Sequence, residues 1–506
     1  MSEESAGLAI TDVLPETGEP VGDTVAPASH DIPLPEHLRE AIAQDWAPAP
    51  PMPHPALAEV ANHAARRRAA LSQRFAGQLV VVPAGAMKVR ANDTEYPFRA
   101  AGSFAWLTGE TVADAVLVMT PTASGHASTL YVREYAQPGE AAYFTDRVHG
   151  AVWVGNAPSV VDTAQVLGLS VRPLSELGSD LAAYRNDECA MLRGFDTSLD
   201  ALLPRGDDRA LAQTLDELRL VKDSWELSRL RHACEATARG FADIARELPM
   251  VAGRPDVRGE RWLEGTFWRR ARLEGNDVGY TSVVASGAHA TTLHWWRNHG
   301  SVERGGLLLA DMGIETDELY TADVTRTLPV DGQWSPAQRK VYRAVHEAQA
   351  AGMDEVKAGA DFLAAHKAAM YVIADHLHSW GILPVSADVS CADDPDRPGA
   401  GLHRRFTLHS TSHMLGIDVH DCAQAREENN REGTLEAGHV LTVEPGLYFQ
   451  TNDLSVPDEL RGIGVRIEDD VVVTDGDPVN LSAMLPRDPD EVTAWMREVQ
   501  GTPAAP

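Results

Sequence analysis

The segment His409-Ser-Thr-Ser-His413-Met-Leu-Gly416-Ile-Asp-Val-His420-Asp421 places three histidines within twelve residues. Histidine provides a nitrogen ligand for metal ions and a proton donor that titrates near neutral pH. Three of them beside a glycine therefore indicate one metal ligand and two groups that face a substrate. The other groups of such a site must come from elsewhere in the chain.

Four acidic residues each stand at the end of an apolar run, namely Asp311, Asp323, Glu444 and Glu468. A short apolar run bounded by turn residues is typical of a buried strand, so each carboxylate is expected at the edge of a sheet. Together with His413 they form an oxygen-rich set of five ligands, which suits two hard or borderline divalent ions. The sequence therefore predicts a site for two metal ions.

The two aspartates of this set lie on runs that a polar turn connects. If the turn centres on Asp317, a hairpin places Asp311 directly across from Asp323, with Cβ atoms roughly 5 Å apart. Two like charges at that separation repel unless a cation lies between them. In the last apolar run, strict alternation puts Arg466 and Glu468 on one face of a strand.

Each of these residues has a simpler interpretation when it is taken alone. A strand-end aspartate most often faces water, and the Arg466–Glu468 couple reads as a surface ion pair. His294, in Thr-Leu-His294-Trp-Trp, reads as a hydrogen-bonded core histidine. The metal interpretation is favoured because all five candidate ligands occur in one chain.

Length, charge and cysteine content narrow the class of protein. At 506 residues with 44% hydrophobic residues, the chain is typical of a soluble protein of two or three domains. The net charge of −30 argues against a nucleic-acid partner, which requires a basic surface. No run reaches the roughly 18 apolar residues of a membrane span, and no basic segment followed by an apolar core opens the chain. The four cysteines have no C-x-x-C spacing, so we expect neither disulfides nor a thiolate site, and a cytoplasmic location.

The first part of the chain divides into a tail and a domain. Residues 1–60 contain eleven acidic residues, one basic residue and ten prolines, which predicts a mostly flexible tail with one short helix at Pro35–Trp46. Residues 61–215 alternate helical and strand-like runs, which is typical of an α/β domain, and we expect this domain to control access or assembly. Strands are predicted at Leu79–Val82, Ala115–Met119, Thr129–Val132 and Ala151–Val154.

The second part, residues 216–490, is predicted to be the catalytic domain and opens with a helical connection. Ser335, Pro336 and Gln338 predict a helix start with a capping box, and a second helix is expected near Asp361. Residues 386–401 are predicted to form a loop. The domain thus divides into similar halves, each a helix pair followed by strands, and a site between the halves lies in a cleft. Residues 491–506 are expected to be a C-terminal tail, and the fold class is α/β (α+β).

These motifs together resemble the pita-bread dinuclear metallopeptidases, and within them the aminopeptidase P family. The resemblance covers residues 61–490 and includes an N-terminal run from Asn92 to Gly109. It rests on Leu293-His294, Asp311-Met-Gly, Tyr320-Thr-Ala-Asp323-Val-Thr-Arg-Thr, the histidine segment 409–421, Thr442-Val-Glu444-Pro-Gly-Leu-Tyr and Gly464-Val-Arg466-Ile-Glu468. It implies a pita-bread domain with pseudo-twofold halves, preceded by a domain of the creatinase and prolidase N-terminal type.

The resemblance also implies a role for each metal ligand. Asp311 would chelate one ion, His413 and Glu444 would hold the other, and Asp323 and Glu468 would bridge both. With mostly oxygen ligands manganese is the favoured ion, and zinc, cobalt and iron remain alternatives. The interval from Asp311 to Asp323 is one residue longer than the commonest family pattern, which we expect the turn to absorb.

Four further residues are implied to act on the substrate. His294 would lie near the scissile nitrogen, His420 near the scissile carbonyl and His409 in the substrate pocket. Arg466 would orient the bridging carboxylates. Ser103 stands where several family members carry an aspartate, which puts in doubt a role for this position in recognising the substrate amine.

The implied activity is that of an Xaa-Pro aminopeptidase, in which a metal-bridging hydroxide attacks the bond before proline and Glu444 carries the proton. A prolidase, which cleaves only dipeptides, has the same ligands and remains the alternative. A metal-free creatinase-type enzyme or a non-enzymatic binding module is disfavoured because all five ligands are present. By analogy with the family, we expect a homodimer or a homotetramer.

Overall fold

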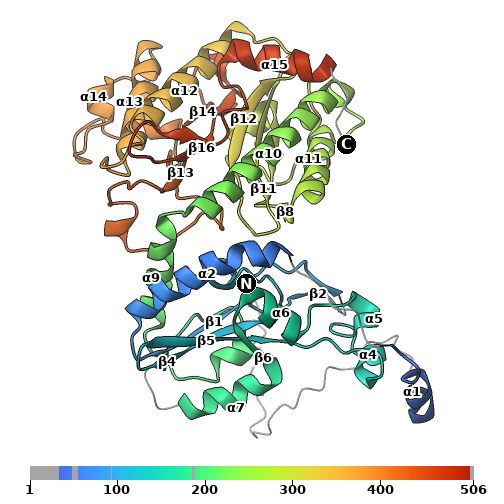
Figure 1. Ribbon diagram of the computed structural model, residues 1–506. Coiled ribbons are helices and arrows are strands. Elements are labelled where there is room, and N and C mark those ends of the chain that lie inside the picture. Colours follow the sequence, from blue (N-terminus) through green and yellow to red (C-terminus); the bar gives the residue numbers. More distant parts are fainter. Residues whose placement is uncertain (1–33, 48–54, 93, 185–188, 502–506) are drawn as a thin grey trace, which may run out of the picture.

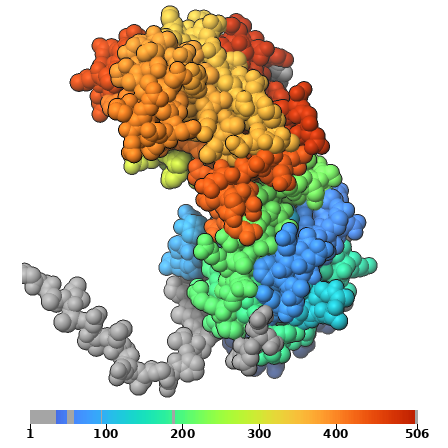
Figure 2. Space-filling view, turned by 90° about the vertical axis from the view of Figure 1, so that its left-hand side faces the viewer, coloured from blue at the N-terminus to red at the C-terminus, as the bar shows by residue number. Residues whose placement is uncertain are grey.

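The computed structural model describes residues 34–47, 55–92, 94–184 and 189–501, which form two stacked domains (Figure 1). The N-terminal domain lies below the C-terminal domain in this view, and helices α9 (Asp208–Leu220) and α10 (Ser224–Val251) lead from one to the other. Residues around 410–440 reach down to α9, where Arg426 pairs with Glu217 (Figure 2). Among the described helices, none has the length and apolar character that a bilayer span requires.

The predicted tail, residues 1–60, is only partly described. The short helix expected at Pro35–Trp46 is present as α1 (Glu36–Ile42), whereas residues 1–33 and 48–54 lie outside the described residues. Helix α2 (Pro55–Arg74) begins inside the predicted tail and already buries Val60. The folded N-terminal domain therefore begins earlier than the predicted residue 61.

A five-stranded sheet forms the centre of the N-terminal domain. Its order is β6-β5-β4-β1-β7, with β1 parallel to β7, β5 parallel to β6, and β4 antiparallel to both of its neighbours. The strands are β1 (Leu79–Pro83), β4 (Val116–Thr122), β5 (Gly125–Val132), β6 (Ser170–Pro173) and β7 (Cys189–Met191), with a small hairpin of β2 (Val89–Ala91) and β3 (Thr94–Glu95). The accompanying helices are α3 (Gly102–Thr108), α4 (Ala141–Thr145), α5 (Ala151–Val154), α6 (Val160–Leu167), α7 (Leu177–Leu181) and α8 (Thr197–Asp200). The α/β class predicted for this domain is confirmed.

One strand prediction in this domain was wrong, because Ala151–Val154 forms the short helix α5. The Gly150 amide donates to the carbonyl of Asp146, and the next residues continue this helical winding. Val152, Trp153 and Val154 are each about half exposed, at 51%, 49% and 50%. An apolar run becomes a strand only where a neighbouring strand pairs with it, and no strand lies beside this one in the described sheet.

The C-terminal domain consists of two similar halves, as the pattern of the sequence predicted. The first half has α10 and α11 (Gly259–Glu274), followed by a sheet of β9 (Val283–Ser286), β10 (Leu307–Met312) and β12 (Val324–Pro329). The second half has α12 (Pro336–Asp354) and α13 (Ala364–Ser379), followed by a sheet of β13 (Val440–Val443), β16 (Asp469–Val472) and β17 (Val479–Asn480). Two further strand pairs are β8 (Asp277–Val278) with β11 (Ile314–Glu315) and β14 (Gly446–Tyr448) with β15 (Gly464–Arg466).

Local sequence signals set the ends of these helices. Ser335 accepts from the amide of Gln338 and the Gln338 side chain accepts from the amide of Ser335, so the predicted capping box of α12 is present. Asp223 and Glu226 form the same reciprocal pair at the start of α10. The loop predicted at residues 386–401 contains one short helix, α14 (Ala387–Ser390).

The predicted domain limits fall inside helices. The division after residue 215 lies within α9, and the chain becomes extended only at Val221, before α10 begins. The division after residue 490 lies within α15 (Pro489–Gly501), which buries Val492 and Met496, so residues 491–501 form a packed helix rather than a tail, and residues 502–506 lie outside the described residues. An amphipathic helix at a chain end is held by the domain it covers.

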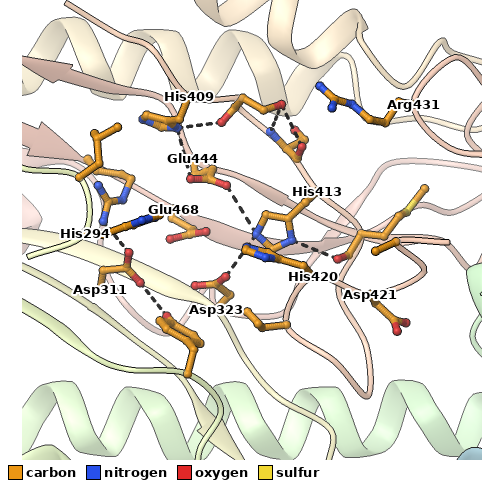
Figure 3. Close-up of a pocket in the computed structure, with 18 of the residues that line it drawn as sticks. His294, Asp311, Asp323, His409, His413, His420, Asp421, Arg431, Glu444 and Glu468 are labelled. Carbon is orange, nitrogen blue, oxygen red and sulfur yellow. Dashed lines mark hydrogen bonds and ion pairs between the residues drawn. The ribbon is translucent and has the colours of Figure 1, made fainter. Parts of the chain in front are cut away.

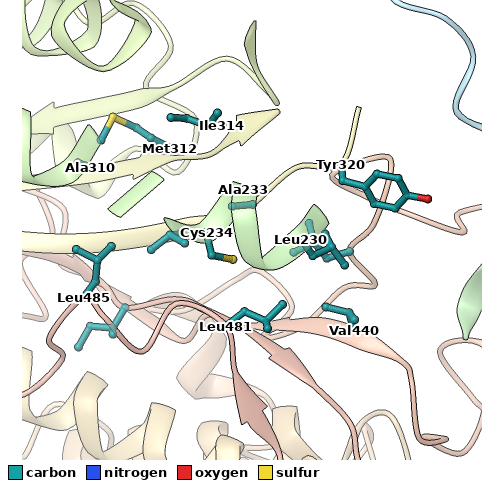
Figure 4. Packing of buried hydrophobic residues seen from close by; sticks show 14 of the residues in the cluster. Leu230, Ala233, Cys234, Ala310, Met312, Ile314, Tyr320, Val440, Leu481 and Leu485 are labelled. Atoms are coloured by element: carbon teal, nitrogen blue, oxygen red, sulfur yellow. The ribbon is translucent and has the colours of Figure 1, made fainter. Parts of the chain in front are cut away.

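Helix α10 is the central element of the C-terminal core (Figure 4). Leu230, Ala233 and Cys234 are fully buried on it, between strand residues of the first half and residues of the second half. The labelled partners are Ala310, Met312, Ile314, Val440, Leu481 and Leu485. Burying a side chain of leucine size stabilises the fold by roughly 1.5–3 kcal/mol, so this helix fixes the two halves against each other.

Candidate metal centre

One cavity of about 770 Å³ contains all the site residues that the sequence predicted. Its lining includes His294, Asp311, Asp323, His409, His413, His420, Glu444, Arg466 and Glu468. Figure 3 shows the labelled carboxylates and histidines of this set directed toward one another. The sequence placed these residues up to 174 positions apart (468 − 294), and the fold brings them together.

The ends of strands position the carboxylates. Asp311 is the fifth residue of β10, and Asp323 immediately precedes β12. Glu444 immediately follows β13, and Glu468 immediately precedes β16. These strands are almost entirely buried, so each carboxylate is carried on rigid backbone to the same cavity.

The hairpin register differs from the prediction by two residues. Asp311 pairs with Thr325, and Glu315 pairs with Thr321, so the turn centres on Glu318 rather than Asp317. Asp311 and Asp323 are therefore diagonal neighbours on one face and not directly opposed. Side chains alternate between the two faces of a strand, so a register shift of two residues leaves Asp323 on the same face as Asp311. Both carboxylates therefore still line the cavity.

Three of the candidate ligands already form a compact group. Asp323, His413 and Glu468 offer ligand atoms that all lie within 4.8 Å of one another. The Nε2 atom of His413 lies 3.3 Å from Asp323 Oδ2 and 3.6 Å from Glu444 Oε1. Its Nδ1 lies 3.0 Å from the carbonyl of Met414, to which it donates, so Nε2 is the nitrogen that faces the carboxylates.

The charge of this group fits divalent cations. Burial and the neighbouring carboxylates raise the pKa of Glu468 well above its ordinary value, and burial raises the pKa of Glu444 to about 7. Burial opposes the charged form of His413, yet Asp323 and Glu444 raise its pKa to about 9. Such shifts arise where acidic groups are crowded without enough positive charge. An oxygen-rich donor set with excess negative charge is what two hard or borderline divalent ions would neutralise.

A hydrogen-bonded layer holds the ligands, and the sequence revealed only part of it. The Tyr280 hydroxyl donates to Asp311 Oδ1 at 2.7 Å, and the Thr325 hydroxyl donates to Glu468 Oε2 at 2.6 Å. Neither residue was predicted. Thr325 stands two residues after Asp323, so strand alternation could have found it, whereas Tyr280 lies in a loop without any local signal.

Arg466 is buried and does not form the expected couple with Glu468. The strand breaks between them, since β15 ends at Arg466 and β16 begins at Asp469. Arg466 instead forms an ion pair with Asp311 and donates to the hydroxyls of Thr325, at 3.1 Å, and Tyr448, at 2.9 Å. The interpretation as a surface ion pair is therefore excluded, and Arg466 supports both sides of the site.

The three remaining histidines differ in environment. His294 is exposed and stacks on Trp296 with ring centroids 5.1 Å apart, so it is not a core histidine. His420 is exposed at the cavity edge, with its ring edge-on to His413 at 4.6 Å. His409 lies 2.8 Å from the Tyr448 hydroxyl, and burial and the charge of Arg466 lower its pKa to about 3. His409 is therefore a neutral hydrogen-bonding group.

Ser103 lies outside this site. It is buried at the domain interface, where its hydroxyl accepts from Arg219 Nη1 at 3.0 Å, and it is not among the residues that line the cavity. Its hydroxyl is therefore engaged by Arg219 and not by a group in the cavity.

Comparison with known proteins assigns both domains. Residues 63–191 match the model described as "Aminopeptidase P, N-terminal domain", and residues 228–475 match "Metallopeptidase family M24". The chain is 49% identical over 447 residues to Xaa-Pro aminopeptidase 2 of Streptomyces coelicolor, covering 88% of this chain and 93% of that one. It is 45% identical over 496 residues to Xaa-Pro aminopeptidase 1 of the same organism, covering 96% and 98%.

A solved structure agrees with these matches. Aminopeptidase P from E. coli with the inhibitor Pro-Leu superposes with a TM-score of 0.76 at 29% sequence identity, covering 87% of this chain and 99% of that one. The match extends over both domains, and it includes the pita-bread arrangement of the two halves. The chain therefore belongs to the aminopeptidase P family of pita-bread metallopeptidases.

Proposed function

We propose that this chain is a metal-dependent aminopeptidase that releases the N-terminal residue from peptides with proline in the second position. The observation that carries the proposal is the convergence of four carboxylates and one histidine in a single cavity lined by further histidines. The Xaa-Pro aminopeptidases to which the chain is similar support this substrate class.

Two divalent ions would occupy the site. Asp311 would bind one ion, His413 and Glu444 the other, and Asp323 and Glu468 would bridge them. Because four of the five ligands provide oxygen, we favour Mn²⁺ over Zn²⁺, Co²⁺ and Fe²⁺. When bound, the ions supply an activated water molecule at neutral pH and polarise the scissile carbonyl.

The protein side chains would handle the proton and the peptide. Glu444 accepts a hydrogen bond from Thr442 at 3.3 Å, which orients its carboxylate at the cavity, where it would take up the proton that the attacking water releases. It would deliver this proton to the proline nitrogen as the bond breaks. His420 and His294, both exposed to the cavity, would donate to the scissile carbonyl and contact the scissile nitrogen respectively.

His409 and Arg466 would shape the pocket for the proline ring. His409 and Arg466 both contact the Tyr448 hydroxyl, so the three side chains form one rigid wall. A proline amide has no N–H and a fixed φ, so a site that required a donating, extended backbone would reject it.

Hydrolysis of matched peptides tests the proposal. Metal-depleted enzyme receives each divalent ion in turn, and release of the first residue is measured from Xaa-Pro-Yaa, Xaa-Ala-Yaa and the dipeptide Xaa-Pro. We expect cleavage of Xaa-Pro-Yaa alone, greatest with Mn²⁺. Cleavage confined to the dipeptide would instead identify a prolidase, and equal cleavage of the alanine peptide would refute a proline-specific site.

We also propose a homodimer or homotetramer and a cytoplasmic location. None of the described residues of the N-terminal domain lines the cavity, which favours a role in assembly. The four cysteines are free, as expected for a reducing compartment. Light scattering on the purified protein and cell fractionation test these two points, and a monomeric or secreted enzyme would contradict them.

A further inference from the structure

Residues 416–421, which we call the His420 strap, carry His420 to the cavity without belonging to a strand or a helix. At the start of the strap, the Gly416 carbonyl accepts from the amide of Thr321, two residues before the candidate ligand Asp323, at 3.1 Å. At its end, the Asp421 amide donates to the carbonyl of Met414, the residue after the candidate ligand His413, at 2.9 Å. Within the described residues the His420 ring has no hydrogen-bond partner, so its direction depends on how the strap is held.

Arg219, on the helix that joins the two domains, holds the strap from outside the cavity. Its Nη2 donates to Asp418 Oδ2 at 2.6 Å and also to Asp421 Oδ1. The two aspartates stand on either side of His420 in the sequence. Figure 3 shows the Asp421 side chain set apart from Asp311 and Asp323. One guanidinium thus fixes both flanks of His420.

The Asp421 side of this contact is buried and tightly packed, whereas the Asp418 side chain is 35% exposed. The side chains of Arg219 and Asp421 are 4% and 1% exposed, and Lys222 Nζ donates to Asp421 Oδ2 at 2.9 Å. A Cβ atom on Gly416 would lie 2.1 Å from Asp421 Oδ2, so the strap closes against its own aspartate. Buried charges of this kind exchange partners only at a high free-energy cost, which makes the arrangement rigid.

Residues of the N-terminal domain also contact the strap and Arg219. Arg99 donates to Asp418 Oδ1 at 3.0 Å and to the Ile417 carbonyl at 2.6 Å, and Ser103 accepts from Arg219 at 3.0 Å. A Cβ atom on Gly102 would lie 2.4 Å from Asp418 Oδ2. The strap is therefore held between the domain without ligands and the domain that has them.

We propose that Arg219 is a positioning residue for His420, and that the N-terminal domain orients this histidine through the two aspartates of the strap. The inference rests on the proposed function, in which His420 faces the scissile carbonyl. In this proposal, the interface between the two domains contributes to catalysis by orienting His420. Stability of the fold alone would not require both flanks of one cavity histidine to share a guanidinium.

A double-mutant cycle tests the inference on the metal-loaded full-length enzyme with an Xaa-Pro-Yaa peptide. Arg219→Gln is expected to lower kcat roughly 10- to 100-fold, since a misplacement near 1 Å costs about 100-fold, with KM and bound metal unchanged. In the His420→Ala background, Arg219→Gln should change kcat less than about twofold, because its effect passes through the missing ring. Arg219→Lys should restore part of the loss.

Gly102→Ala provides a second test that leaves every charge in place. The new methyl group meets the end of the Asp418 side chain, so the fold can accommodate it while Asp418 moves. We expect a loss of kcat of roughly threefold to tenfold in the same direction. Gly178→Ala is the matched control, because a Cβ atom there meets nothing within 4 Å, and it should behave as wild type.

The outcomes separate the two proposals. Equal losses from Arg219→Gln with and without His420, or loss of bound metal, would show a general structural role and overturn the inference alone. If Arg219→Gln does not fold, unchanged kcat in Gly102→Ala overturns it, and a reduced kcat that vanishes in the His420→Ala background supports it. A wild-type enzyme that does not cleave the peptide would overturn the proposed function and this inference with it.

Discussion

Removal of the Tyr280 hydroxyl tests how the surrounding layer supports the metal centre. This hydroxyl donates to Asp311 Oδ1 at 2.7 Å, and Asp311 is otherwise held by Arg466. Tyr280→Phe keeps the ring and its packing but removes one hydrogen bond to a charged group. Such a bond contributes about 1.5–3 kcal/mol. Because about 1.4 kcal/mol corresponds to a factor of ten, the affinity for the ion at Asp311 should fall roughly 10- to 100-fold.

The assay is titration of the metal-depleted variant with Mn²⁺ against a competing chelator, followed by activity at saturating metal. We expect one binding step to weaken and kcat to recover largely at high metal concentration. Tyr342→Phe is the matched control, since its buried hydroxyl donates to the Arg487 carbonyl at 2.9 Å, away from the cavity lining. Unchanged affinity in Tyr280→Phe, or an equal loss in Tyr342→Phe, would refute the assignment of Tyr280 to the metal centre.

Three further changes probe the ligands and the core. Asp323→Ala should abolish activity and bound metal together, as measured by peptide cleavage and elemental analysis; full activity would refute its role as a bridging ligand. The wild-type protein should be about 2.7 kcal/mol less stable after chelation of the metal than at a metal concentration 100-fold above Kd, and its Tm should be lower. An unchanged Tm would argue against metal binding to the folded state. Arg326→Met should reduce the free energy of unfolding, measured in urea, by about 3–5 kcal/mol. The reason is that Arg326 lies 2.7 Å from the buried carboxylate of Asp469, which would lose this partner. A change below about 1 kcal/mol would contradict that reasoning.

Arg229→Met is the control for the last change. Arg229 pairs with Glu318 at 3.2 Å, and both side chains are about a quarter exposed, at 27% and 23%. A partly exposed ion pair contributes about 0–1 kcal/mol, so this variant should unfold close to wild type. The difference between the two variants measures the effect of burial rather than the loss of an arginine.

The sequence by itself determined the candidate ligands and the class of each domain. Asp311, Asp323, Glu444 and Glu468 each end an apolar run, and His413 stands in a histidine-rich segment. Apolar periodicity and capping residues act over a few positions, so they report local structure directly. The capping box at Ser335 and the repeated order of helix pair and strands could be read for the same reason.

Only the tertiary structure decided which residues support those ligands. The hairpin register follows the pairing of Glu315 with Thr321, and Ala151–Val154 forms a short helix that belongs to none of the described sheets. Tyr280 reaches Asp311 across 31 positions, and Arg219 reaches Asp421 across 202. Contacts between such distant residues leave no periodic signal in the chain, because folding alone sets which loops and helices meet. The chemical groups of the site can therefore be identified from the sequence, while their orientation depends on how the two domains and the two halves pack.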